Sequence, residues 1–468
     1  MRAGRDYRIS GAMSDATRLP VELKGHWLWG MGHEFAERPL EALTACGRLG
    51  DVVRMRFGPY RIQQLNNPEH IKHVFQNPRV YGKQTMSYSR LRGLLGLGLV
   101  VSDGDFWLRQ RRIAQPAFHR ERIVGFADAM VRAATALGDR WQAPAERGEH
   151  VEISADLTRA TLTVVCETLL GGDVGEDGER VARAFPVLNE IISDRLNKLM
   201  PMPSWVPTRA NRRYRAALAE LDETVFRIIA RRRASGDDGG DLLSMLMHAR
   251  DEESGAGMTD RQLRDEVTTI LLAGHETTAV ALTWAFYLLS QHPEAERRLH
   301  EELERVLGGR APGLADVEKL AYTRQVIDET LRLYPPVWAM DRSVAADDVI
   351  DGYRMPKGTY VLVSPWVVQR APSLWSEPEA FRPERFARGA AELPRYAYFP
   401  FIGGPRQCIG NTFALLEAQL MLATLAQRFR LALVPGQSIE LLPLLTLRPK
   451  HGIYMTPSPL APPLRTAA

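Results

Sequence analysis

The segment from residue 267 to residue 291 limits the fold of this chain more than any other part of the sequence. It is mostly apolar, and about 20 mostly apolar residues are enough for a helix to cross a membrane. His275 and Glu276 lie near its middle, however, and an ionised group is costly at that depth in lipid. A capping box beginning at Thr259 and the helical spacing of the apolar residues predict a helix over 260–290. It would be roughly 45 Å long and buried inside a globular protein.

The remaining segments favour a mainly α-helical chain with small β-sheets, which is the α+β class. Residues 1–18 form a polar tail, and neither a linker nor a repeat divides the rest, so we expect one domain over 19–468. Two β-branched runs between residues 51 and 65 predict a pair of strands. Residues 82–104 are rich in glycine and leucine and are expected to form a mobile loop over an apolar surface.

Charge and cysteine content exclude several classes of protein. The chain has 60 Lys and Arg against 56 Asp and Glu, and this balance argues against a dedicated nucleic-acid binder. Its three cysteines, Cys46, Cys166 and Cys408, are far apart, so neither a disulfide framework nor a zinc ribbon is expected. The N-terminus has no apolar core, and we therefore expect no signal peptide, no membrane anchor and a cytoplasmic location.

Cys408 stands in the loop F-I-G-G-P-R-Q-C-I-G, residues 401–410, which has a tight turn and leads into a predicted helix. A cysteine at the start of a helix meets free backbone N–H groups and the positive end of the helix dipole. Both favour the thiolate, which is the form that binds metals, and Arg406 adds a nearby cation. Most lone cysteines are inert and buried, and we assign that role to the other two.

The loop resembles the haem-binding loop of the cytochrome P-450 family, F-x-x-G-x-R-x-C-x-G, at every fixed position. The matching residues are Phe401, Gly404, Arg406, Cys408 and Gly410. The resemblance implies a haem b whose iron is bound by the Cys408 thiolate, with Phe401 beside this ligand and Arg406 at a haem propionate. It also implies the family's fold, with haem between a long distal helix and the cysteine loop, in a soluble bacterial member. A thiolate ligand favours cleavage of the O–O bond.

A second motif, A-G-H-E-T-T at residues 273–278, lies in the middle of the predicted long helix. A glycine inside a helix costs about 1 kcal/mol relative to alanine, so Gly274 indicates the close approach of another group. Alone, the motif would fit a packing glycine beside a solvated glutamate. Together with the loop it resembles the family's distal helix. That likeness implies that Ala273 and Gly274 leave room for dioxygen, that Thr277 stabilises the iron-bound peroxide and that Glu276 helps to deliver protons. The zinc signature H-E-x-x-H is incomplete, because its last position is alanine.

Glu329 and Arg332 form an E-x-x-R pair on one face of a predicted helix. Alone, this pair would fit an exposed ion pair, which stabilises a protein by less than about 1 kcal/mol. The later P-E-R-F string resembles a further motif of the family. The resemblance implies a structural network of Glu329, Arg332 and Arg385.

Trp107 and Arg111 stand four residues apart on a predicted basic helix. The family has W-x-x-x-R at this place, which implies that both side chains donate to a haem propionate. Arg342 resembles another propionate-binding arginine, although a surface arginine would fit this position nearly as well.

The chain shows no G-x-G-x-x-G after a predicted strand, so we expect no flavin or nicotinamide domain. Electrons from NAD(P)H are therefore expected to arrive indirectly, through a ferredoxin or flavodoxin and its reductase. Such donors are usually acidic, and the basic residues Arg109 and Arg112 can receive them. A solvated run of charge explains these two arginines equally well. We expect a monomer.

The expected reaction inserts one atom of O2 into an apolar, mid-sized substrate, by hydroxylation or epoxidation. A terpenoid, a steroid, a fatty acyl chain or a polyketide would fit, and the sequence does not choose among them. Six residues are expected in the substrate pocket: Leu94, Leu271, Val337, Met340, Leu445 and Thr446. A peroxide-using or rearranging haem-thiolate enzyme is an alternative, which the Glu276-Thr277 pair disfavours. A non-catalytic haem-binding protein is another, but it would normally carry an output domain.

Overall fold

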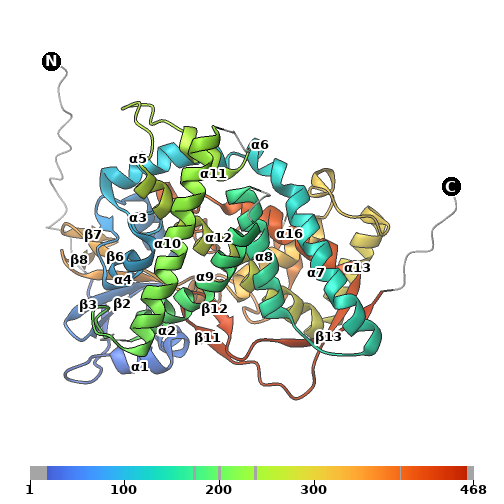
Figure 1. Ribbon diagram of the computed structural model, residues 1–468. Helices are drawn as coiled ribbons and strands as arrows, with labels where there is room; N and C mark the ends of the chain where they lie inside the picture. Colours follow the sequence, from blue (N-terminus) through green and yellow to red (C-terminus); the bar gives the residue numbers. More distant parts are fainter. Residues whose placement is uncertain (1–17, 172–174, 199–201, 237–239, 390–391, 461–468) are drawn as a thin grey trace.

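The computed structural model describes residues 18–171, 175–198, 202–236, 240–389 and 392–460 (Figure 1). The predicted N-terminal tail lies outside the described residues, except for Arg18. The chain is mostly helical with small sheets, so the expected α+β class is confirmed. None of the helices in the described ranges combines the length and the apolar character that a membrane span requires.

The predicted central helix is present as α12 (Asp260–Gln291). Its capping box is formed, because the Gln262 N–H donates to the Thr259 hydroxyl and the Thr259 N–H donates to the Gln262 side chain. The helix lies behind α10 (Arg209–Ser235) and packs along α8 (Ile153–Leu170) (Figure 1). The first half of the helix belongs to one hydrophobic core cluster and the second half to another, so α12 runs through both parts of the core.

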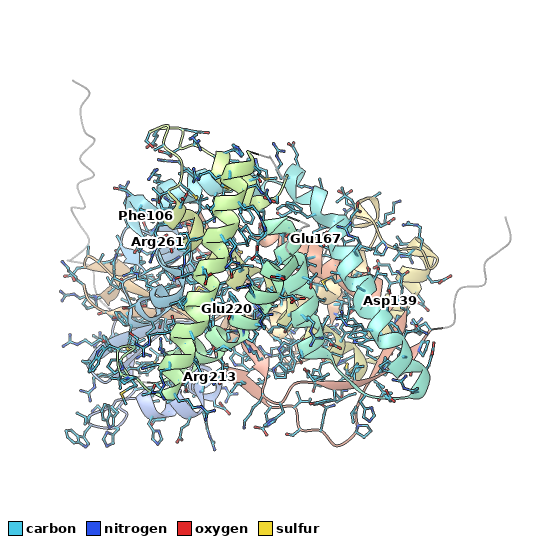
Figure 2. The ribbon with its side chains drawn as sticks, in the orientation of Figure 1. Phe106, Asp139, Glu167, Arg213, Glu220 and Arg261 are labelled. Atoms are coloured by element: carbon cyan, nitrogen blue, oxygen red, sulfur yellow. The ribbon has the colours of Figure 1, made fainter. Side chains whose placement is uncertain are left out.

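The helix after the cysteine loop, α16 (Asn411–Ala426), is buried on most of its surface. It packs against α7 (Ala127–Arg147), α14 (Ala321–Leu333) and α12, which fixes the cysteine loop relative to α12. The outer layer is polar by contrast. Arg213 and Glu220, for example, project from the outer face of α10, in front of the buried helices (Figure 2).

The largest sheet has the strand order β1-β2-β3-β9-β6-β4. The predicted strand pair is present as β2 (Val52–Phe57) and β3 (Tyr60–Leu65), which are antiparallel. β9 (Tyr360–Val363) runs parallel to β3, and β6 (Met340–Val344) pairs with β9 in the antiparallel sense. This register sets Arg342 of β6 opposite Val361, inside the sheet rather than at its edge.

The remaining elements lie around these helices and this sheet. The further helices are α1 (Gly32–Glu37), α2 (Pro39–Gly47), α3 (Pro68–Gln76), α4 (Met86–Leu95), α5 (Gly104–Ala114), α6 (Arg120–Ile123), α9 (Gly175–Asn197), α11 (Leu242–His248), α13 (Pro293–Leu307) and α15 (Pro365–Val368). The further strands are β1 (Val21–Glu22), β4 (Tyr81–Gly82), β5 (Val151–Glu152), β7 (Asp348–Ile350), β8 (Tyr353–Met355), β10 (Phe429–Leu433), β11 (Leu441–Pro443), β12 (Leu447–Pro449) and β13 (Tyr454–Pro459).

The loop prediction for residues 82–104 is wrong, because α4 occupies the middle of this segment. The chain then turns over the start of α12, where the Leu97 N–H donates to Asp265 at 2.8 Å and the Leu99 N–H to Glu266 at 3.1 Å. A side chain at Gly98 would overlap α12, since its Cβ would lie 2.0 Å from the Thr269 hydroxyl. The glycines that suggested mobility instead allow this turn to pack closely on α12.

Candidate active site

The cysteine loop is held by its own backbone and by the neighbouring helix α3. Gly404 has a φ of +67°, and a Cβ at this position would lie 2.3 Å from the Phe75 carbonyl oxygen. The Cys408 N–H donates to the Phe401 carbonyl at 3.0 Å, which closes the loop just before α16 begins. The loop therefore needs glycine at Gly404, and it presents Cys408 in a fixed position.

Burial raises the pKa of the Cys408 thiol, while the Gly410 backbone N–H and the Arg111 cation oppose this effect. The expectation that Arg406 supplies the nearby cation is wrong. Arg406 instead lies 4.0 Å above the Trp107 ring and forms an ion pair with Asp103. A coordinated metal ion would oppose the effect of burial and favour the thiolate, which is the form that binds it.

A cavity of about 580 Å³ lies between the cysteine loop and α12. Cys408 and Phe401 line it on the side of the loop, and Ala273, Gly274 and Thr277 line it on the side of α12. Ala273 is exposed to this space although most of α12 is buried. The cavity has the size of a typical ligand pocket, which is roughly 300–1,000 Å³.

Among the cations that line the same cavity, Lys83 lies close to Arg111, Arg342 and Arg406, whose charges act on it. Arg111 donates to the Gln407 carbonyl at 2.9 Å, which ties α5 to the cysteine loop. The Arg406 Nε is buried without a hydrogen-bond partner among the described residues.

Arg342 is 3% exposed, so the alternative of a surface arginine is wrong. It donates to the Tyr88 hydroxyl at 2.7 Å.

Lys83 is a cation that the sequence analysis did not predict, because nothing in its local sequence distinguishes it from other lysines. It is 7% exposed, and it donates to the carbonyls of Leu99 and Val100. Burial lowers the pKa of Lys83, and the nearby arginines lower it further.

These features fit a haem. The cavity has apolar walls, a cysteine at one face, and more buried cations than anions at its edge. Two propionates would offset this excess of positive charge, and Arg406 retains a free donor for such an anion. Lys83, Arg111, Arg342 and Arg406 are therefore the residues that could hold the haem edge, and Cys408 is the one that could hold the iron.

The distal helix brings the predicted dioxygen residues to the cavity. The Thr277 hydroxyl donates to the Ala273 carbonyl at 2.7 Å, one turn earlier in α12. The close approach expected at Gly274 comes from α8, because a Cβ there would lie 3.1 Å from a methyl group of Val165. Gly274 therefore allows α8 and α12 to pack closely, and it also lies in the cavity wall.

Glu276 is held by residues that the sequence reasoning did not connect with it. The Asn189 amide on α9 donates to its Oε2 at 2.6 Å. The Thr446 hydroxyl and the Arg448 Nε each donate to its Oε1 at 2.5 Å. Asn189, Thr446 and Arg448 come from segments far apart in the chain, so no sequence motif predicts that they meet at Glu276. The side chain of Arg448 is 32% exposed, and the network thus connects the 3% exposed Glu276 with solvent.

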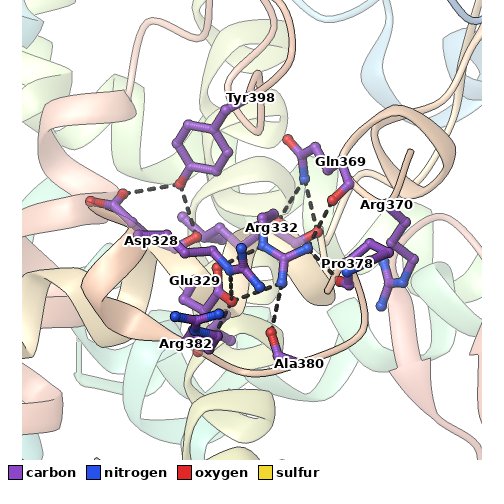
Figure 3. A network of polar contacts seen from close by, with 12 residues as sticks. Asp328, Glu329, Arg332, Gln369, Arg370, Pro378, Ala380, Arg382 and Tyr398 are labelled. Atoms are coloured by element: carbon purple, nitrogen blue, oxygen red, sulfur yellow. Dashed lines mark hydrogen bonds and ion pairs between the residues drawn. The ribbon is translucent and has the colours of Figure 1, made fainter. Parts of the chain in front are cut away.

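The predicted trio lies together, because Arg332 and Arg385 both pair with Glu329. Figure 3 shows Glu329 and Arg332 at the centre of this network. Glu329 and Arg332 are both 0% exposed and are joined by two hydrogen bonds, of 2.6 and 2.7 Å. Arg332 also donates to the carbonyls of Gln369, Pro378 and Ala380. Arg332 thus ties α14 to the irregular segment that leads toward the cysteine loop.

Four of the six expected pocket residues line the cavity: Val337, Met340, Leu445 and Thr446. The prediction is wrong for Leu94 and Leu271, which are 0% exposed and belong to the core cluster. Both lie on helices, and in each case the side chain faces the core while helical neighbours such as Leu91 and Ile270 line the cavity.

The basic residues expected at a donor surface are engaged within the chain. Arg112 forms ion pairs with Asp251 and Glu253, and Arg109 donates to the Gly257 carbonyl at 3.1 Å. These contacts connect α5 to the loop before α12, and they fit the alternative of locally neutralised charge better than a free cationic patch.

Comparisons with known proteins agree with this architecture. The family model for cytochrome P-450 matches residues 20–460. Cyclooctatin synthase of Streptomyces melanosporofaciens is 38% identical over 97% of this chain and 98% of its own. Cyclooctat-9-en-7-ol 5-monooxygenase of the same organism is 40% identical over 87% of this chain and 89% of its own.

Pentalenene oxygenase of Streptomyces avermitilis is 35% identical over 89% of this chain and 92% of its own. The crystal structure of the cytochrome P450DA haem domain superposes with a TM-score of 0.87, at 27% identity, and covers 96% of this chain and 100% of that one. The chain therefore belongs to the cytochrome P-450 family and is a haem-dependent monooxygenase.

Proposed function

We propose that this monooxygenase hydroxylates or epoxidises an apolar terpenoid at a haem bound through Cys408. The observation that carries the proposal is that Cys408 and the distal segment 273–277 line one largely apolar cavity. A haem bound by a thiolate supplies the activation of dioxygen, because this ligand favours cleavage of the O–O bond. Phe401 lies beside Cys408 in the same wall and would shield the sulfur from water.

The haem edge would be held by the cations that surround the cavity near α5 and β6. Arg406 and Arg342 are buried and have their guanidinium groups fixed by Asp103 and by Tyr88. Trp107 lies against Arg406 and Arg111 against the cysteine loop. These contacts would hold the side chains in place before the propionates bind, which reduces the entropy lost on binding.

Protons would reach the reacting oxygen through Thr277 and Glu276. Thr277 lines the cavity one turn from Ala273 and donates its hydroxyl proton to the Ala273 carbonyl, so its oxygen is left to accept a hydrogen bond from a group in the space next to α12. Glu276 would pass protons from the Arg448 side to this space, since the network that holds Glu276 extends to solvent. The overall change is RH + O2 + two electrons + two protons to ROH + H2O.

The substrate class rests on the cavity and on the relatives. The wall residues Val337, Met340 and Leu445 are apolar and would bind a hydrocarbon skeleton. Three relatives carry names of terpenoid chemistry, cyclooctatin synthase, cyclooctat-9-en-7-ol 5-monooxygenase and pentalenene oxygenase. We propose that electrons come from NAD(P)H through a separate ferredoxin or flavodoxin and its reductase, and that the enzyme acts as a monomer.

Two optical measurements test the proposal. The reduced protein with carbon monoxide is expected to show the strongly red-shifted Soret band of thiolate ligation, and Cys408→Ala should lose it. Addition of cyclooctat-9-en-7-ol or pentalenene should then shift the ferric spectrum toward high spin. A globin-like band would contradict ligation by Cys408. A normal band without response to either compound would contradict the terpenoid assignment alone.

A further inference from the structure

The face of α12 that lines the cavity carries one carboxyl group well away from the dioxygen residues. The lining positions Glu266, Ile270, Ala273 and Thr277 are four, three and four residues apart, which is the spacing of a single helix face. Glu266 is 1% exposed, and its neighbours in this part of the wall are largely apolar, for example Leu99. A carboxyl group in such a wall requires a polar partner.

Glu266 has one such partner within the chain and keeps capacity for a second. Its Oε2 accepts the Leu99 N–H at 3.1 Å, and no other hydrogen bond to Glu266 is found in the described part of the chain. Burial raises the pKa of Glu266 to about 8, and the Asp265 charge adds to this effect, while the Leu99 N–H and Lys83 oppose it. The side chain is therefore mainly a neutral acid at pH 7, with an O–H group to donate.

Lys83 does not supply the second hydrogen-bond partner of Glu266. Its ammonium group donates to the carbonyls of Leu99 and Val100. It acts on Glu266 only through its charge, and no ion pair between the two is found in the described part of the chain. A buried donor without an acceptor is costly, so an acceptor supplied by a ligand in the cavity would bind favourably. The acceptor must be small and neutral, because a charged group would have to be desolvated in the same apolar wall.

We propose that Glu266 binds a hydroxyl group on an otherwise apolar terpenoid, so that the substrate of this enzyme is a terpenoid alcohol. Glu266 precedes Ala273 by seven residues on α12, a separation of about 10 Å along the helix axis. The hydroxyl group would thus fix the skeleton at one end and place a carbon beside Ala273 and Thr277 for oxidation. This inference rests on the proposed function and adds to it the oxidation state of the substrate.

The names of the relatives include both an alcohol and a hydrocarbon. The name of one refers to an alcohol, cyclooctat-9-en-7-ol, and the name of another to a hydrocarbon, pentalenene. Overall similarity therefore does not decide between the two, whereas a neutral carboxyl group in the wall favours the alcohol.

The test compares cyclooctat-9-en-7-ol with the hydrocarbon that lacks its hydroxyl group, using the spin-state titration of the haem-loaded enzyme. We expect the alcohol to bind about 3- to 10-fold more tightly, as one hydrogen bond would provide. Glu266→Met should bring this ratio close to one, and Glu266→Gln should keep most of it, because the amide can still donate. The matched control is Glu417→Met, since Glu417 is another buried carboxyl group with a pKa raised to about 8 that lies outside the cavity wall.

An infrared measurement on the wild type supports the test if Glu266→Met fails to fold. The carboxylic acid band that Glu266→Gln removes should shift when the alcohol binds and stay in place when the hydrocarbon binds. Equal affinity of the wild type for both compounds, or an unchanged ratio in Glu266→Met, would overturn the inference while leaving the terpenoid assignment intact. Failure of both compounds to bind would contradict the proposed function itself, and the inference would fall with it.

Discussion

Arg448 on β12 donates a hydrogen bond from its Nε to Oε1 of Glu276 at 2.5 Å, so a strand near the C-terminus holds the carboxylate of the distal helix. A buried carboxylate is stable only when it is paired, and an arginine is well suited to pair with it. Thr446 binds the same oxygen and also lines the cavity. If Glu276 delivers protons as proposed, Arg448 acts through it as a positioning residue.

Replacing Arg448 should disturb proton delivery more than it disturbs the fold. In Arg448→Gln the buried Glu276 loses its counter-charge and one of the donors that hold its Oε1 in place. We expect less product per electron and a change in the pH profile of that yield, whereas Arg448→Lys should restore part of both. The charged and titratable groups next to Glu276 are Arg448 and His275, and burial lowers the pKa of His275, which keeps it neutral.

Arg430 provides the control for Arg448. It pairs with the buried Glu296 on α13, which does not line the cavity. Arg430→Gln should leave the product yield per electron unchanged at each pH. If Arg448→Gln gives the same yield and the same profile as this control, Arg448 has no role in positioning Glu276.

Thr277→Ala should uncouple electron consumption from product formation. The variant loses the hydroxyl group that faces the cavity, while the helix loses only the side-chain bond to the Ala273 carbonyl. We expect reductant use to continue, with peroxide released in place of product. Thr283 is the matched control, because its hydroxyl makes the same bond to the Ala279 carbonyl at 2.8 Å but lies outside the cavity wall. Coupling that stays normal in Thr277→Ala would remove Thr277 from the mechanism.

The parts of the site that the sequence predicted are those encoded in short segments. The cysteine loop keeps its motif residues within positions 401–410 and α12 keeps its own within positions 273–278, so the two motifs can be recognised together in the sequence. Lys83 and Arg448 reach the site only through tertiary packing, and nothing in their local sequence separates them from other cations. The error at Leu271 has a different origin, because a fully buried helix is apolar on every side and its pattern does not reveal which face borders the cavity.

Glu329→Gln should destabilise the protein strongly. Arg332 would then be a buried cation whose remaining partners are backbone carbonyls, and breaking a buried pair in this way costs about 3–5 kcal/mol. Urea denaturation of the haem-loaded protein measures the loss. Glu294→Gln, which removes an exposed ion pair with Arg297, is the control and should leave the midpoint unchanged. Equal midpoints for the two variants would show that the network does not stabilise the fold.

Glu417 makes stability depend on pH in a direction that can be tested. This side chain on α16 is 0% exposed. Burial raises its pKa from 4.5 to about 8, and the Thr278 side chain opposes this effect only in part. Between these two values the folded protein keeps a proton that the unfolded chain has released. The free energy of unfolding therefore falls as the pH rises through this range.

Glu417→Gln removes the titrating group at nearly constant volume. Relative to the wild type, the variant should gain stability as the pH rises from about 5 to about 8, by an amount on the order of 1–4 kcal/mol. Urea denaturation at both pH values measures this difference. Glu266→Gln is expected to follow the same trend, since burial raises the pKa of Glu266 to about 8 as well. A difference between Glu417→Gln and wild type that is the same at both pH values would mean that Glu417 is ionised in the folded protein. Its charge would then be stabilised by the Thr278 side chain, which is the group that opposes the effect of burial.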